Sequence, residues 1–327
     1  MLINIVYIIL GIFLVIWGAN RLTDGASRLA RGMRVPEIFI GLTIVAAGTS
    51  APELFVSLVS ALKGTSDLAV GNVIGSNIFN TMLIVGCSAF IAPMPVVKMT
   101  VTKDIPWAAM AAFLLFLLCI DDMDSPHLWG NEISRSDGII LLVGFTAFMI
   151  YTFNSARKAG LMPTEEELED NRELPKDYSK LGRNIFWIVL GLACLIVGSD
   201  LFVDAASYVA HRYGVRQSVV GLTIVAGGTS LPELATSVVA AYKGRSAIAI
   251  GNVIGSNVFN ILLILGLTAV VHPMRIMGIT IVDLTMMLVS MGLLWMFAFT
   301  KYYVSRREGA VLIGGFAVYM GWLLYLL

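Results

Sequence analysis

The amino-acid sequence predicts an all-helical, polytopic membrane protein. Of its 327 residues, 57% are hydrophobic and only 13% are charged, and the mean hydropathy is +0.84. A soluble domain needs a more highly charged surface than this composition can supply. Its apolar runs are long enough, at about 1.5 Å per residue, to cross roughly 30 Å of hydrocarbon. The alternating segments of roughly ten residues that are typical of a membrane barrel are not found.

Ten apolar segments are expected to form transmembrane helices, because each is bounded by charged residues, proline or glycine. They comprise residues 3–27, 37–62, 68–92, 105–121, 137–155, 184–210, 215–241, 247–270, 277–299 and 309–327. The first segment has neither the basic region nor the cleavage site of a signal peptide, so we expect it to be retained as a helix. One long charged segment then divides the chain into a five-helix repeat (1–155), a cytoplasmic linker (156–183) and a second five-helix repeat (184–327).

The two halves carry a duplicated sequence. GLTIVAAGTSAPE, which begins at Gly41, and AVGNVIGSNIFN recur 180 positions later as GLTIVAGGTSLPE and AIGNVIGSNVFN. This period is far longer than that of a solenoid repeat, so half of the protein has been duplicated. Because five is an odd number of helices, the second copy enters the membrane from the opposite side, which predicts two inverted-topology repeats.

The distribution of basic residues predicts a multi-pass protein of the cell membrane with both termini outside. In a Gram-negative cell this would be the inner membrane. Most Lys and Arg residues then lie in cytoplasmic loops and in the linker, and the external loops carry only Lys63, Arg135, Arg212, Arg216 and Arg275.

The second helix carries polar residues on one face. Thr49 and Ser50 precede Glu53 by four and three positions, so the three side chains lie on the same face. Pro52 cannot donate a backbone hydrogen bond, so we expect the helix to bend or unwind around residues 46–48 and to leave carbonyl oxygens available. A carboxylate and unpaired carbonyls are costly within hydrocarbon, and they indicate a bound ligand.

The third helix adds Asn72, Ser76 and Asn80 at four-residue steps, again on one face. The same types of residue recur in the second repeat, and a pseudo-two-fold axis would bring Glu53 and Glu233 together near the middle of the membrane. Such a site offers only oxygen ligands, without imidazole or thiolate, and calcium or sodium fits it best. Two neighbouring carboxylates cannot both stay ionised and unpaired, so the empty site should resist crossing the membrane, which favours obligatory exchange.

Other functions are less compatible with these residues. Simple helix packing does not explain the glutamates, because the motif helices lack an Arg or Lys that could neutralise them. A passive channel is disfavoured by the enclosed site and its helix-breaking prolines. An enzyme would need a base to activate Ser50 or Ser230, but His127, His211 and His272 fall at helix ends or loops. The balanced charge also gives no indication of a nucleic-acid partner, so we predict neither an enzyme nor a cofactor.

The duplicated motifs resemble the alpha repeats of the calcium/cation antiporter superfamily, whose sodium/calcium exchangers carry G-T-S-x-P-E and G-N-x-x-G-S-N signatures. The chain's size and ten-helix plan are similar to those of prokaryotic members. The resemblance implies an eight-helix core across which two long helices, here the first and sixth, slide in alternating access. It also implies a set of ion ligands: Glu53, Glu233, Thr49, Ser50, Ser76, Asn80, Thr229, Ser230, Ser256 and Asn260, with the carbonyls of Ala46 and Ala226.

Some members, including potassium-dependent exchangers, have aspartate at one or both of the positions of Asn80 and Asn260, so asparagine at both makes potassium co-transport less expected. The predicted function is therefore secondary antiport of calcium against sodium. Calcium/proton antiport by the same two glutamates stays open, since carboxylates can also carry protons. Membrane lipid is the expected environment, and no obligatory protein partner is evident.

Asp24 and Asp204 also correspond at the 180-residue offset. Asp24 lies three and four residues from Arg21 and Arg28, so we expect it to form an ion pair within its own helix.

Overall fold

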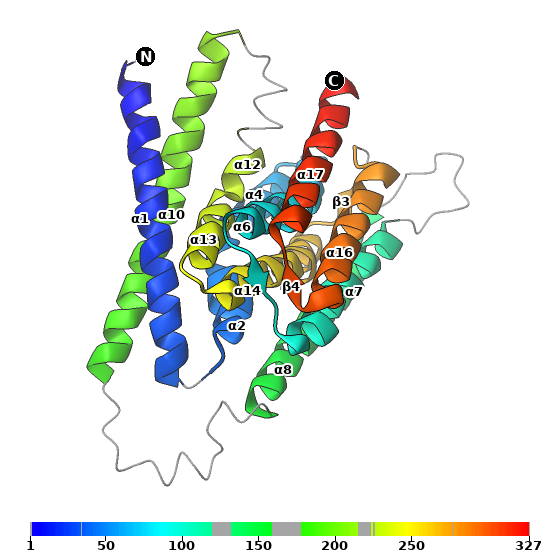
Figure 1. Cartoon of the computed structure of the whole chain (residues 1–327). Helices are drawn as coiled ribbons and strands as arrows, with labels where there is room; N and C mark the ends of the chain where they lie inside the picture. The colour runs from blue at the N-terminus through cyan, green and yellow to red at the C-terminus, as the bar shows by residue number, and fades with distance from the viewer. Residues whose placement is uncertain are drawn as a thin grey trace.

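The computed structural model describes residues 2–33, 35–119, 132–158, 178–214, 224, 226–276 and 278–326. Nearly all of these residues are helical. Among them, eight helices are long and apolar enough to cross a membrane, or nine if the bent pair Glu37–Thr49 and Ala51–Leu62 is one span. Most of the first part of the predicted span 215–241 lies outside the described residues. Figure 1 shows both chain ends at the same end of the helix bundle.

The helices follow the predicted segments closely. The first half contains α1 (Leu2–Met33), α2 (Glu37–Ile40), η1 (Gly41–Val45), α3 (Ala46–Thr49), α4 (Ala51–Leu62), α5 (Ser66–Ile78), η2 (Phe79–Ile84), α6 (Val85–Ile91), η3 (Thr100–Asp104), α7 (Ile105–Leu118) and α8 (Arg135–Lys158). The second half contains α10 (Tyr178–Arg212), α12 (Ala226–Thr229), α13 (Leu231–Tyr242), α14 (Ser246–Val258), η6 (Phe259–Leu265), α15 (Gly266–Val271), α16 (Ile281–Lys301) and α17 (Arg306–Leu326). Helices α8 and α10 extend into both ends of the predicted linker 156–183, and residues 159–177 lie outside the described part.

The long helices α1 and α10 lie side by side and antiparallel, beside the rest of the bundle (Figure 1). A Cβ atom added at Gly11 would lie 2.7 Å from the backbone oxygen of Gly198, and one added at Gly18 would lie 2.7 Å from that of Gly191. Side chains at these positions would separate the helices, so glycine lets the two backbones touch. A shift of 180 residues exchanges the two contacts, because Gly11 corresponds to Gly191 and Gly18 to Gly198.

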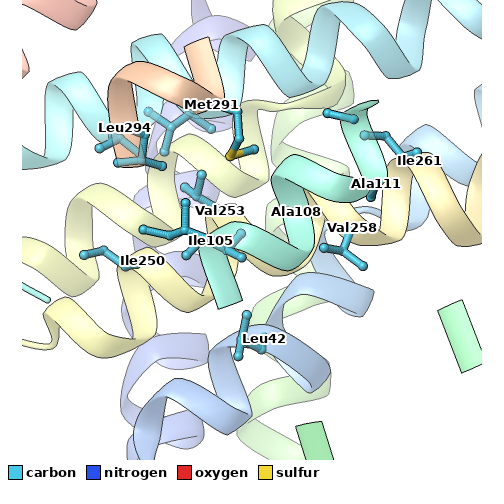
Figure 2. Packing of buried hydrophobic residues seen from close by; sticks show 14 of the residues in the cluster. Leu42, Ile105, Ala108, Ala111, Ile250, Val253, Val258, Ile261, Met291 and Leu294 are labelled. Atoms are coloured by element: carbon cyan, nitrogen blue, oxygen red, sulfur yellow. The ribbon is translucent and has the colours of Figure 1, made fainter. Parts of the chain in front are cut away.

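The remaining helices form a packed core around α14, in which every residue except Ala247 is buried. Figure 2 shows Ile105, Ala108 and Ala111 of α7 close to side chains of α14 and α16, including Val253 and Met291. Where lipid is the solvent, such close packing replaces the hydrophobic effect as the main source of helix association.

Two short strand pairs connect the halves at the ends of the bundle. β1 (Met94–Pro95) pairs with β4 (Tyr303–Val304), and β2 (Glu132–Ile133) pairs with β3 (Met274–Arg275). Each pair joins two loops that the basic residues assign to the same side of the membrane, so the packing is compatible with the predicted orientation.

The prediction of an ion pair within α1 is wrong. Asp24 Oδ1 instead lies 2.8 Å from Lys243 Nζ, at the end of α13. Arg21, one of the expected partners, has its guanidinium 5.1 Å and 4.7 Å from the ring centres of Trp17 and Trp187. A nearby aromatic pair therefore holds the arginine, and Asp24 connects α1 to the second half of the chain.

Candidate ion-binding site

Two helix breaks position the polar motifs. The helix of residues 37–49 meets α4 at an angle of 44°, and the break falls at Ser50, whose φ and ψ are −82° and 6°. Ser230 has nearly the same conformation, with φ −89° and ψ 7°. Pro52 and Pro232 follow in the first turns of α4 and α13, where a helix does not need their missing N–H groups.

The break therefore comes slightly later than the sequence predicts. The expected position was residues 46–48, but these residues remain helical in α3. The N–H group of Ser50 donates to the Ala46 carbonyl at 3.0 Å, and the Thr49 hydroxyl lies 3.4 Å from the same oxygen, so that oxygen is hydrogen-bonded. The later position has a physical reason. Proline fits the first turn of a helix, where its missing N–H group is not needed, so the break falls just before that turn.

Glu53 and Glu233 are both fully buried, with 0% of their surface exposed. Each accepts a hydrogen bond from the opposite repeat: Ser50 Oγ donates to Glu233 Oε1 at 3.0 Å, and Ser230 Oγ donates to Glu53 Oε1 at 3.0 Å. A shift of 180 residues converts one contact into the other. The breaks at the two serines thus bring both carboxylates to one place, although their sequences are far apart.

Two asparagines support this arrangement from the helices behind it. Asn252 Nδ2 donates to Ser237 Oγ at 3.0 Å and to the Glu233 carbonyl at 3.5 Å, while its Oδ1 accepts from Thr49 at 3.1 Å. Asn252 therefore fixes the first turn of α13 relative to both motifs.

The other repeat has the equivalent contacts. Asn72 Nδ2 donates to Ser57 Oγ at 3.1 Å and to the Glu53 carbonyl at 3.4 Å, and its Oδ1 accepts from Thr229 at 3.4 Å. The sequence placed Asn72 on the polar face of its helix, but the predicted ion ligands included neither asparagine, and the serine partners were not identified. Their recurrence at the same 180-residue offset was the available signal, since Ser57 also corresponds to Ser237.

The predicted site residues are largely brought together. Ser76 Oγ lies 3.1 Å from Ser230 Oγ, and Ser256 is fully buried in α14, where its hydroxyl has no hydrogen-bond partner among the described residues. Asn80 and Asn260 are buried in η2 and η6. The backbone of Ala226 begins α12, and no described contact joins Asn80, Asn260 or Ala226 to the two glutamates.

Several buried oxygens in this region have no hydrogen-bond donor among the described residues. They include Glu53 Oε2, Glu233 Oε2, Asn80 Oδ1 and Asn260 Oδ1. An unpartnered carboxylate oxygen is costly in a low-dielectric interior, and no Lys or Arg of the described part forms an ion pair with either glutamate. The described ranges also hold no group of three or more His, Cys, Asp and Glu side chains suited to a metal. Because the unpartnered carboxylate and amide oxygens lie with hydroxyl groups in this region, the arrangement is suited to a hard cation bound by carboxylate, hydroxyl and amide oxygens.

Comparisons with known proteins agree with this chemistry. The family described as "Sodium/calcium exchanger protein" matches residues 3–154 and 183–325. The inner membrane protein YrbG of Escherichia coli is 35% identical over 100% of this chain and 98% of its own length. The sodium/calcium exchanger MaX1 of Methanosarcina acetivorans is 31% identical over 99% of each chain.

A solved structure is also similar over nearly the whole chain. The sodium-calcium exchanger NCX_Mj, solved after soaking with sodium and zero calcium, superposes with a TM-score of 0.83 at 29% identity, covering 98% of this chain and 99% of that one. Both halves of the sequence, their motifs and the buried pair of carboxylates fit the same assignment. The chain is a multi-pass membrane protein that belongs to the sodium/calcium exchanger family of calcium/cation antiporters.

Proposed function

We propose that this protein is a secondary active antiporter that exchanges calcium for sodium. The observation that carries the proposal is the pair of buried carboxylate oxygens, Glu53 Oε2 and Glu233 Oε2, that have no hydrogen-bond donor among the described residues. One calcium ion would neutralise both carboxylates, and more than one sodium ion would be needed to do the same. The names of MaX1 and NCX_Mj support sodium as the counter-ion.

The proposed ligands are those that the motifs predict. The two glutamates supply the charge, hydroxyl and amide side chains complete the shell, and the Ala46 and Ala226 carbonyls contribute to sodium binding. The ion is the transported substrate, so the mechanism requires neither a cofactor nor an obligatory protein partner.

We further propose ten membrane spans arranged as two inverted repeats, 1–155 and 184–327, joined by the linker. The reciprocal contacts of Ser50 with Glu233 and of Ser230 with Glu53 support a pseudo-two-fold axis through the site. The common end of the bundle at which both termini lie supports an even number of spans (Figure 1). With the linker in the cytoplasm, both termini lie outside, and the name of YrbG supports the inner membrane as the location.

Alternating access is supported by an asymmetry between the repeats. Asp24 of α1 forms an ion pair with Lys243. The equivalent residues, Asp204 of α10 and Lys63, are both exposed, and no ion pair joins them. Helix α1 packs along α13, but among the described helices α10 and α4 are not packed together in this way.

The exposed fractions of two equivalent asparagines of the site differ in the same sense. Asn252 is fully buried, whereas the equivalent Asn72 is partly exposed. These differences fit a conformation closed on the side of Lys243 and more open on the side of Lys63. Exchanging the roles of the two repeats would expose the site to the other side, as alternating access requires.

Calcium uptake into proteoliposomes tests the counter-ion. We expect rapid uptake when the vesicles are loaded with sodium, and little uptake when only a proton gradient is imposed. Glu53→Gln and Glu233→Gln should each abolish uptake but leave membrane insertion intact, because a neutral amide of similar volume cannot supply the charge. Uptake that ignores internal sodium but follows the proton gradient would instead establish calcium/proton antiport.

A further inference from the structure

At a buried position beside the site, one repeat has a polar residue and the other an apolar residue. Thr81 of η2 corresponds at the 180-residue offset to Ile261 of η6, and both side chains are fully buried. A hydroxyl group in one copy and a hydrocarbon group in the other can hold different neighbours. The neighbours here are the amide side chains of the signature motifs.

In the copy with the hydroxyl group, the amides form a chain of hydrogen bonds. Asn257 Nδ2 donates to Thr81 Oγ1 at 2.8 Å, and Asn80 Nδ2 donates to Asn257 Oδ1 at 3.2 Å. Asn80 Oδ1 is left without a donor among the described residues. Since Thr81 and Asn80 are neighbours on one helix and Asn257 belongs to the other repeat, the chain crosses the interface between the repeats.

The equivalent chain is absent from the other copy. Asn77 corresponds to Asn257 and Asn260 to Asn80, but neither side-chain nitrogen nor oxygen of these two residues has a hydrogen-bond partner among the described residues. Because Ile261 offers no polar group, it cannot anchor Asn77 as Thr81 anchors Asn257. Asn257 and Asn80 are therefore held by hydrogen bonds, whereas the equivalent residues Asn77 and Asn260 are not.

The direction of the chain matters for ion binding, because only the oxygen of an amide can bind a cation. While Asn257 directs its Nδ2 to Thr81, its oxygen faces Asn80, and Asn80 must then present its own Nδ2 to Asn257. The oxygen of Asn80 is the group that remains available. A reversed Asn257 would reverse Asn80 as well and would leave a nitrogen in its place.

We propose that Thr81 is a positioning residue for ion binding: its hydroxyl accepts from Asn257 and so helps to hold the Asn80 side chain in the arrangement that leaves the Asn80 oxygen available to the transported cation. The inference rests on the proposed ion site and identifies which of its two amide ligands is preorganised. Asn80 is held in a binding orientation before the ion arrives, whereas Asn260 must be ordered by the ion itself. A preorganised ligand costs less to use, so Thr81 contributes to affinity without touching the ion.

The test compares matched substitutions at the two equivalent positions. Thr81→Val removes the hydroxyl with little change in volume, Thr81→Ser keeps it, and Ile261→Val is the control in the other repeat. In sodium-loaded proteoliposomes, Thr81→Val should raise KM for calcium about fivefold, which corresponds to the loss of one buried hydrogen bond, with the maximal rate nearly unchanged. Thr81→Ser and Ile261→Val should both resemble the wild type.

A second comparison separates positioning from packing. In the background of Asn80→Ala, Thr81→Val should have no additional effect on KM, because the group that it positions is gone. The inference is overturned if Thr81→Ser weakens calcium binding as much as Thr81→Val, or if the effects of Thr81→Val and Asn80→Ala are simply additive. Failure of the wild type to exchange calcium would count against the proposed function, whereas calcium titration of the purified protein by calorimetry would still test the role of Thr81.

Discussion

Breaking the ion pair between Asp24 and Lys243 should shift the protein toward the opposite conformation. The charged atoms are 2.8 Å apart, and the side chains of Lys243 and Asp24 are 27% and 44% exposed. Solvent screening of such a partly exposed pair limits its contribution to about 0.5–1 kcal/mol. Lys243→Gln should therefore change the ratio of the two conformations by about two- to fivefold.

The internal duplication provides a control with the opposite sign. Lys63→Gln removes the equivalent lysine, whose partner in the other conformation would be Asp204. Lys243→Gln should favour opening on its own side of the membrane, and Lys63→Gln should favour the conformation described above. The two variants should therefore change the apparent calcium affinity on a given side in opposite directions, since that affinity scales with the population of the binding-competent state.

The assay is calcium transport in vesicles of both orientations, with KM determined on each side of the membrane. Asp24→Asn should reproduce the effect of Lys243→Gln, and the double variant should add little to either, because both remove the same interaction. The reasoning is refuted if Lys243→Gln and Lys63→Gln change KM in the same direction on the same side, or if Asp24→Asn has no effect.

Three further predictions concern the site and the fold. Ser50→Ala or Ser230→Ala should raise KM for calcium at least about tenfold, because each removes a hydrogen bond to a buried carboxylate of the other repeat; unchanged KM would separate the serines from the site. Gly18→Leu should lower thermal stability, since even a Cβ there would lie 2.7 Å from a backbone oxygen of α10, whereas Gly32→Leu, with no described atom within 4 Å of its Cβ, should be tolerated. Asp283→Ala should cost about 1–2 kcal/mol, measurable as a lower Tm with transport retained, because it removes the capping box at the start of α16.

Much of the architecture could be predicted from the sequence because it depends on local composition and on the duplication. Apolar runs predicted the positions of the helices, and the repeated motifs predicted that a pseudo-two-fold axis would bring Glu53 and Glu233 together. Both kinds of evidence are visible in a single chain, since hydrophobic length and residue type determine what the membrane tolerates.

Features that depend on tertiary contact were not predictable in the same way. The partner of Asp24 lies 219 positions away, and the rule for neighbours on one helix pointed instead to Arg21 and Arg28. The π-helical segments η1, η2 and η6 lie beside the site. The local sequence does not predict a π-helix strongly, because such a segment forms where side chains must be redirected. The role of Thr81 likewise requires the position of Asn257 on the opposite repeat.

A structure determined with bound calcium tests the central claim most directly. We expect a calcium ion about 2.3–2.6 Å from oxygens of both Glu53 and Glu233, replaced by sodium when crystals are transferred to sodium without calcium. Calcium bound by only one of the two glutamates, or bound at another place while both carboxylates stay without a cation, would contradict the account.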